Sequence, residues 1–141
     1  MQYIYKITGG DFKNAGNASS AVKKILSKLN VDHSVSRHIV VALYEAEVNI
    51  VAHAYSGTIE VNIDDLRIHI ILDDKGPGIP DIKKAMEEGY STASPMVREM
   101  GFGAGMGLAN IKRNVDKLLI SSEPGKGTKV ELIHYLKPDT N

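Results

Sequence analysis

Two polar residues four positions apart, Glu45 and Asn49, are the first candidates for chemistry in this sequence. The apolar spacing predicts a helix over residues 34–55, which places both side chains on one flank of its apolar stripe. A carboxylate can take a proton from an attacking hydroxyl, and an amide oxygen is a hard ligand suited to magnesium. The same helical phase predicts that Glu47 points to the far side, toward solvent. We therefore expect Glu45 to be the reactive carboxylate, although so short a pair is also common as the polar rim of a helix.

A second candidate is Asp74, which ends a predicted strand over residues 66–74 and precedes Gly76, Pro77 and Gly78. The even-numbered residues of this strand are apolar, so Asp74 is expected to face the helix-covered side of a sheet. Its carboxylate could accept a hydrogen bond from an exocyclic amine, while the glycines let a planar ring approach the backbone. This chemistry suits adenine. Taken alone, the same residues also fit a turn with a solvated aspartate.

Glycines alternate from Gly101 to Gly107, directly before a predicted helix. Backbone N–H groups and the helix N-terminus can converge there on an anion, and phosphate is the natural guest. The cluster is not a P-loop, because no lysine followed by serine or threonine comes after it, and flexibility alone is the competing interpretation. The candidate phosphate-binding residues are Gly103, Ala104, Gly105, Met106, Gly107 and Leu108.

Thr128 lies on a predicted late strand, on the same face as Val130 and Leu132. Its hydroxyl could therefore face the same interior side as Asp74, although an ordinary strand threonine is the alternative. The five histidines show no metal-binding spacing with carboxylates, and we assign them no catalytic role.

The elements that must position these residues are expected to form one domain over residues 1–141. Strand and helix signals alternate with turn signals along the whole chain. This order predicts an α+β two-layer sandwich, with a mixed but mostly antiparallel sheet and helices on one of its faces. Its expected parts are a strand and helix over 1–31, the helix over 34–55, a hairpin of strands 58–64 and 66–74, an adenine-binding and lid region over 74–108, and a C-terminal hairpin over 117–136.

Composition narrows the classes of partner. Lysine and arginine number 17, equal to the 17 aspartates and glutamates, so no basic excess suggests a nucleic acid or an anionic membrane. The chain has no cysteine, which excludes disulfides and thiol catalysis, and no apolar run approaches membrane-spanning length. We expect a cytoplasmic protein whose partner is a protein or a small molecule.

Four motifs occur in a set order: E-x-x-x-N on a helix, DxGPGI after a strand, a glycine-rich segment before a helix, and G-T-x-V at a late strand. Each motif alone is weakly specific, but their joint order resembles the N box, two glycine boxes and terminal threonine of the GHKL, or Bergerat-fold, ATPases. The short chain and its EGYSTA segment are similar to bacterial anti-sigma factors and switch serine kinases.

The resemblance implies that Glu45 is the general base, Asn49 a magnesium ligand and Asp74 the adenine-binding aspartate, which Thr128 supports through water. Gly76 and Gly78 would flank the adenine. The implied ligands are ATP and Mg²⁺.

The implied activity is transfer of a phosphoryl group to a serine of a small antagonist protein. A sigma factor or a phosphatase is a further implied partner, and a homodimer stays open. Because no lysine or arginine stands among residues 101–107, the alternative is a nucleotide-gated binding switch with little or no phosphoryl transfer.

Overall fold

The computed structural model describes residues 1–79, 82–86 and 107–136 of the chain. The predicted strands and helices within these ranges are present, with ends that differ by one to a few residues. The elements are β1 (Gln2–Thr8), the 3-10 helix η1 (Phe12–Asn14), α1 (Asn17–Lys28), α2 (His33–His53), β2 (Ser56–Ile63), β3 (Arg67–Lys75), α3 (Ile82–Ala85), α5 (Gly107–Asn114), β4 (Lys117–Glu123) and β5 (Gly127–Tyr135).

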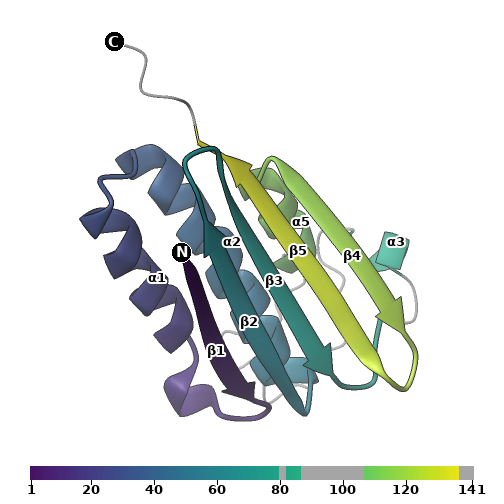
Figure 1. Ribbon diagram of the computed structural model, residues 1–141. Helices are drawn as coiled ribbons and strands as arrows, with labels where there is room; N and C mark the ends of the chain where they lie inside the picture. The colour runs from purple at the N-terminus through teal and green to yellow at the C-terminus, as the bar shows by residue number, and fades with distance from the viewer. Residues whose placement is uncertain (80–81, 87–106, 137–141) are drawn as a thin grey trace.

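The strands form one sheet in the order β1-β2-β3-β5-β4. The helices α1, α2 and α5 cover one face of this sheet (Figure 1). The expected α+β two-layer sandwich is therefore confirmed. The prediction was a mixed but mostly antiparallel sheet. All four pairs of neighbouring strands among the described residues are antiparallel.

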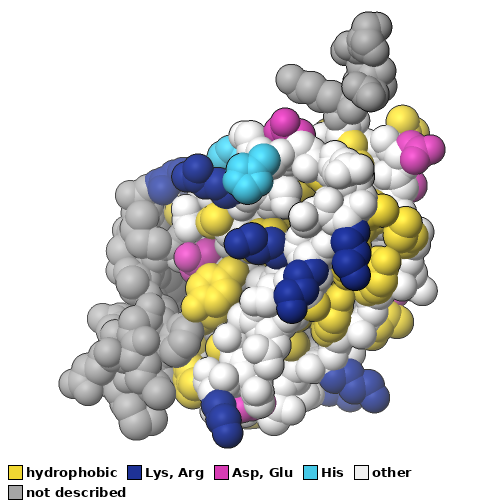
Figure 2. Space-filling model, turned by 90° about the vertical axis from the view of Figure 1, so that its left-hand side faces the viewer, with side chains coloured by type: hydrophobic (Ala, Val, Ile, Leu, Met, Phe, Trp, Pro, Cys, Tyr) yellow, Lys and Arg dark blue, Asp and Glu magenta, His cyan; other side chains and the backbone are white. Residues whose placement is uncertain are grey.

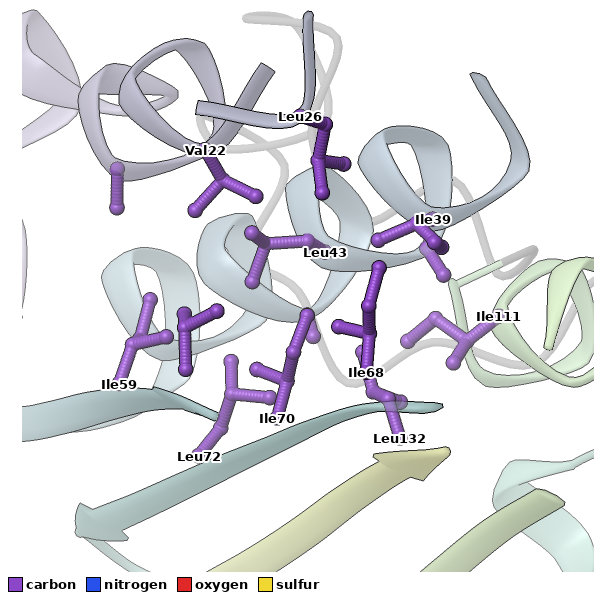
Figure 3. Packing of buried hydrophobic residues seen from close by; sticks show 14 of the residues in the cluster. Val22, Leu26, Ile39, Leu43, Ile59, Ile68, Ile70, Leu72, Ile111 and Leu132 are labelled. Carbon is purple, nitrogen blue, oxygen red and sulfur yellow. The ribbon is translucent and has the colours of Figure 1, made fainter. Parts of the chain in front are cut away.

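The hydrophobic core lies between α2 and the centre of the sheet (Figure 3). Strand register aligns the inward residues, so that Ile70 stands opposite Val61 on one side and Leu132 on the other. Helices α1 and α5 add their own apolar stripes to the two sides of α2. The most deeply buried of these side chains include Val22, Leu26, Ile39, Leu43, Ile59, Ile68, Ile70, Leu72, Ile111 and Leu132.

Helix α2 is shorter at its C-terminal end than the predicted 34–55. It begins at His33, where the Asp32 carboxylate caps it by accepting a hydrogen bond from the Val35 amide at 3.2 Å. It ends at His53, since Ala54 is extended and the Tyr55 amide donates to the Lys75 carbonyl at 2.8 Å. The last predicted residue of the helix is thus hydrogen-bonded to the end of β3.

Glu47 contradicts its predicted position toward solvent, because its exposed fraction is only 1%. Its carboxylate accepts four hydrogen bonds from the start of α1: from the amides of Gly16, Ala18 and Ser19 at 3.0, 3.2 and 3.0 Å, and from the Ser19 hydroxyl at 2.6 Å. Amides in the first turn of a helix have no partner inside the helix, and a negative charge there is favoured by the helix dipole.

The reason for this error is the width of the buried surface of α2. Residues 43, 47, 50 and 51 recur at helical spacing, and all four are buried. Glu47 therefore lies on the flank of α2 that faces α1, opposite the flank that carries Glu45 and Asn49. Helical phase alone separates the two flanks but does not show that a neighbouring helix covers one of them.

Helix α1 is amphipathic. Ala18, Val22 and Leu26 are buried, whereas Lys23 and Lys24 are exposed. Figure 2 shows several lysine and arginine side chains on the side of the molecule that includes α1. None of the helices described in the structure is both long and apolar enough to span a lipid bilayer.

Removal of the Glu47 carboxylate should destabilise the fold. Glu47→Ala leaves buried amides at the start of α1 without an acceptor, and we expect it to lower the free energy of unfolding by about 3 kcal/mol. Urea denaturation followed by circular dichroism measures this change. Glu123→Ala, at a side chain that is 65% exposed, is the matched control and should have a small effect. Equal stability of both variants would contradict the structural role of Glu47.

Candidate functional site

Asp74 and Thr128 lie side by side at one end of the sheet. The Thr128 amide donates a hydrogen bond to Asp74 Oδ1 at 3.0 Å, which joins β5 to the end of β3. Thr128 is buried, with 8% of its surface exposed, in line with its predicted inward face. The strand alternation thus brings together two predicted site residues that are 54 positions apart in the sequence.

The environment of Asp74 disfavours its charged form. Burial raises the pKa of the Asp74 carboxyl, the hydrogen bond from the Thr128 amide lowers it, and the negative charge of Asp73 raises it further. The net direction is upward. A half-buried carboxylate with a raised pKa is typical of a site where a ligand supplies the missing hydrogen bonds.

The loop after β3 is held by the turn between β4 and β5. The Gly76 amide donates to the Lys126 carbonyl at 3.1 Å, and the Gly125 amide donates to the Pro77 carbonyl at 2.9 Å. These backbone hydrogen bonds fix the start of the loop next to Asp74. The predicted adenine-binding segment therefore has a defined position at the edge of the helical layer.

The packing of the protein itself constrains the two glycines of this loop. Gly78 has φ of +78°, and a Cβ there would lie 2.6 Å from the Glu123 carbonyl oxygen, so this position demands glycine. A Cβ on Gly76 would lie 3.0 Å from the Ala54 Cα at the end of α2, which leaves little room for a side chain. The role of both glycines beside an adenine ring stays a prediction.

Ser122 belongs to the same cluster, although sequence reasoning missed it. Its hydroxyl lies 2.9 Å from the Thr128 hydroxyl, donates to the Gly127 carbonyl at 3.1 Å, and accepts from the Ile79 amide at 2.7 Å. The signal was a polar residue at an inward position, since Ser122 continues the face of Leu118 and Ile120. Ser122 therefore joins the loop after β3 to both strands of the C-terminal hairpin.

The second part of the site is the flank of α2 that faces α5. A Cβ on Gly107, the first residue of α5, would lie 3.2 Å from both the Oδ1 and the Nδ2 atoms of Asn49. One turn earlier on α2, Glu45 Oε1 accepts a hydrogen bond from Asn110 Nδ2 at 3.3 Å. The structure thus brings both predicted residues of the E-x-x-x-N motif against the helix that follows the glycine cluster.

The glycine cluster itself lies mostly beyond the part of the chain that the structure describes. This holds for Gly103, Ala104, Gly105 and Met106, and for the rest of residues 87–106 in the predicted adenine-binding and lid region over 74–108. Gly107 is described at the start of α5, where it touches the Asn49 amide. Leu108 is 8% exposed and belongs to the hydrophobic core, so only its backbone is available to a ligand.

Helix α2 places the parts of the site in a line. Gly76 packs on Ala54 just beyond its C-terminal end, Gly107 packs on Asn49, and Asn110 contacts Glu45. At 1.5 Å of rise per residue, the distance along the helix from Ala54 to Glu45 is about 13 Å. The arrangement therefore suits an elongated ligand, with a ring at the Asp74 end and a reacting group near Glu45.

The residues present fit a divalent cation that is held mainly by a ligand. The Asn49 side chain makes no hydrogen bond to any other described residue, and its amide oxygen is a hard ligand of the kind that magnesium takes. Among the described residues no group of three or more histidines, aspartates and glutamates could hold a metal ion. Magnesium commonly takes few protein ligands and completes its shell with phosphate oxygens and water.

Comparisons with known proteins identify the family of this chain. Residues 34–139 match the family model described as histidine kinase-, DNA gyrase B-, and HSP90-like ATPase. The serine/threonine-protein kinase RsbT of Bacillus subtilis is 33% identical over 137 residues, which is 93% of each chain. An anti-sigma F factor of Caldanaerobacter subterraneus is 33% identical over 129 residues, or 88% of this chain and 87% of that protein.

A solved structure of the RsbU and RsbW domains of Rv1364c from Mycobacterium tuberculosis has the same fold. Its TM-score is 0.63 at 20% sequence identity, and the match covers 96% of this chain and 33% of that one. The mycobacterial sensor histidine kinase MprB matches with a TM-score of 0.55 at 17% identity, covering 98% of this chain and 99% of that one.

The raised pKa of Asp74 predicts how its removal changes stability. A carboxyl whose pKa is higher in the folded state favours folding when protonated and loses that contribution as pH rises through the two pKa values. Without nucleotide, Asp74→Asn should therefore unfold at a higher temperature than wild type at pH 7, and the difference should shrink as pH falls toward 4. Differential scanning calorimetry measures both effects. The control is Asp65→Asn at an exposed turn, and a lower melting temperature for Asp74→Asn alone would contradict the assignment.

Proposed function

We propose that this chain, which belongs to the histidine kinase-, DNA gyrase B-, and HSP90-like ATPase family, transfers phosphoryl groups. The protein is an ATP-dependent serine/threonine kinase that regulates a partner protein. The observation that carries the proposal is the placement of Asn49 and Glu45 on one flank of α2, whose C-terminal end packs against the loop that follows Asp74.

Glu45 accepts the proton of the attacking hydroxyl. The hydroxyl oxygen of a protein serine forms a bond to the γ-phosphorus of ATP while the bond from that phosphorus to the β,γ-bridging oxygen breaks. The serine proton passes to the Glu45 carboxylate, and ADP leaves. Because phosphoryl transfer depends chiefly on positioning and charge stabilisation, the protein mainly has to align the hydroxyl with the phosphorus.

Asn49 and Asp74 hold the nucleotide at its two ends. The Asp74 carboxylate accepts a hydrogen bond from the exocyclic amine of adenine, while the Thr128 amide on β5 donates to the same carboxylate and the Thr128 hydroxyl pairs with Ser122 on β4. The Asn49 oxygen would hold Mg²⁺, which would neutralise charge on the phosphates. The glycine-rich sequence before Gly107 predicts backbone amides for the phosphates, at positions outside the described residues.

The phosphoacceptor is a serine on a small antagonist protein, and a sigma factor is a further partner. The names of three similar relatives support this class of function, since they describe a serine/threonine-protein kinase and anti-sigma F factors. The equal numbers of acidic and basic residues also favour a protein partner over a nucleic acid.

A nucleotide-gated binding switch is the second candidate function. The observation in its favour is the absence of lysine and arginine from residues 99–111, the stretch that includes the glycine cluster. A cation in this position would clamp the γ-phosphate and stabilise charge in the transition state. Without it, ATP could order the partner-binding surface with little phosphoryl transfer.

The two functions differ in a direct assay. Wild-type protein, Mg²⁺ and ATP labelled at the γ-phosphate are incubated with candidate acceptor proteins, and labelled serine is measured after acid hydrolysis. Labelled serine is expected under the kinase proposal. Binding of ATP with no label on any acceptor tried would favour the binding switch.

Variants at α2 separate the two roles of its polar flank. Glu45→Ala should keep ATP affinity nearly intact, because the carboxylate faces the hydroxyl, but reduce transfer by about 10²–10⁴-fold. Asn49→Ala should weaken magnesium-dependent binding and transfer together, since a metal ligand acts in both the ground and the transition state. Calorimetry and single-turnover transfer give the two quantities. Transfer at the wild-type rate in Glu45→Ala would exclude Glu45 as the base.

A further inference from the structure

Asn110 links helix α5 to the carboxylate of Glu45. It lies on α5 three residues after Gly107, so the two share one face of the helix. Gly107 touches Asn49, and Asn110 donates a hydrogen bond to Glu45 Oε1 at 3.3 Å. One face of α5 therefore contacts both polar residues of the α2 flank.

A second pair of residues fixes where Asn110 sits. Asn114 Nδ2 donates to the Asn110 carbonyl oxygen at 2.7 Å and lies 3.4 Å from Asn110 Oδ1. Asn114 Oδ1 lies 2.8 Å from His38 Nδ1, one further contact between α5 and α2. The four side chains of His38, Asn114, Asn110 and Glu45 thus form a continuous hydrogen-bonded series along the seam between the two helices.

Two groups that can only accept hydrogen bonds fix the direction of donation in this series. A backbone carbonyl only accepts, so the Asn114 atom facing the Asn110 carbonyl must be its NH₂ group, and the Asn114 oxygen then faces His38. An ionised carboxylate also only accepts, so Asn110 must present its NH₂ group to Glu45. His38 therefore carries a proton on Nδ1, and every donor in the series points toward Glu45.

We propose that Asn110 is a positioning residue for Glu45, an inference that rests on the proposed kinase function. Its amide occupies Oε1 and turns the carboxylate so that Oε2 receives the serine proton. Oε2 makes no hydrogen bond to any other residue in the described part of the chain. A partly buried glutamate still has several rotatable bonds, and a fixed donor reduces the number of orientations from which proton transfer must start. The distance of 3.3 Å lies at the long end for a hydrogen bond, as is common for catalytic contacts without substrate.

The primary test is a comparison of Asn110→Ala with Lys112→Ala, an exposed position on the same helix. Asn110→Ala should lower kcat for phosphoryl transfer by about 10- to 100-fold, while KM for ATP changes by less than about threefold. Lys112→Ala should leave both unchanged. The reaction is transfer from γ-labelled ATP to an acceptor protein found in the labelling assay. If that assay finds none, the reaction is hydrolysis of the labelled ATP by water. Asn110→Asp keeps the shape of the side chain but replaces the donor with a second carboxylate, and it should be at least as impaired.

A double-mutant cycle shows whether Asn110 acts through Glu45. In a Glu45→Gln background, Asn110→Ala should cause little further loss of transfer, because the carboxylate that it positions is gone. The same fold-loss in both backgrounds would overturn the positioning role. A wild-type kcat in Asn110→Ala would also overturn it while leaving the proposed function intact, provided that Glu45→Gln is impaired. Full activity of Glu45→Gln would overturn both.

A measurement without nucleotide gives an independent readout. In the ¹H–¹⁵N spectrum of the protein, the side-chain amide resonances of Asn110 should move when Glu45→Ala removes their acceptor. They should stay in place in Glu123→Ala, where the substituted side chain is 65% exposed. Unchanged Asn110 resonances in Glu45→Ala would show that the contact does not exist in solution.

Discussion

The Glu47 carboxylate holds α1 against α2 at a point where apolar packing alone leaves polar groups unsatisfied. The first amides of α1 have no intrahelical acceptors, and Glu47 accepts hydrogen bonds from three of them and from the Ser19 hydroxyl. A buried carboxylate is favourable only with such a complete set of donors. Because this contact fixes one flank of α2, the opposite flank keeps a constant orientation toward α5, and the positions of Glu45 and Asn49 depend on it.

The two flanks of one helix thus serve different purposes. Toward α1, the glutamate is fully satisfied by protein donors and contributes to the fold. Toward α5, Glu45 has a single described donor, Asn110, and Asn49 has none among the described residues. Glu45 and Asn49 therefore keep acceptor oxygens that no other described residue occupies, as a general base and a metal ligand require. The same contrast holds at the sheet, where Asp74 is half-buried with one amide donor and a raised pKa.

Much of this arrangement could be predicted from the sequence because it follows from local periodicity. Strand alternation placed Asp74 and Thr128 on the inward face, and helical spacing placed Glu45 and Asn49 on one flank. The position of Glu47 was wrong, since periodicity gives the direction of a side chain relative to its own helix but not which neighbour covers it. Ser122 and Asn110 were missed for the same reason: their roles depend on contacts 43 and 65 residues away in the chain.

The proposed function depends most directly on the binding of adenine at Asp74, at the end of β3. Calorimetric titration of ATP with Mg²⁺ into wild type and Asp74→Asn tests it most directly, with Asp65→Asn as the control for loss of a surface charge. Asp74→Asn should weaken ATP binding by about 1.5–3 kcal/mol, the scale of a hydrogen bond to a charged group, while Asp65→Asn should leave it unchanged. An unchanged dissociation constant in folded Asp74→Asn would contradict it.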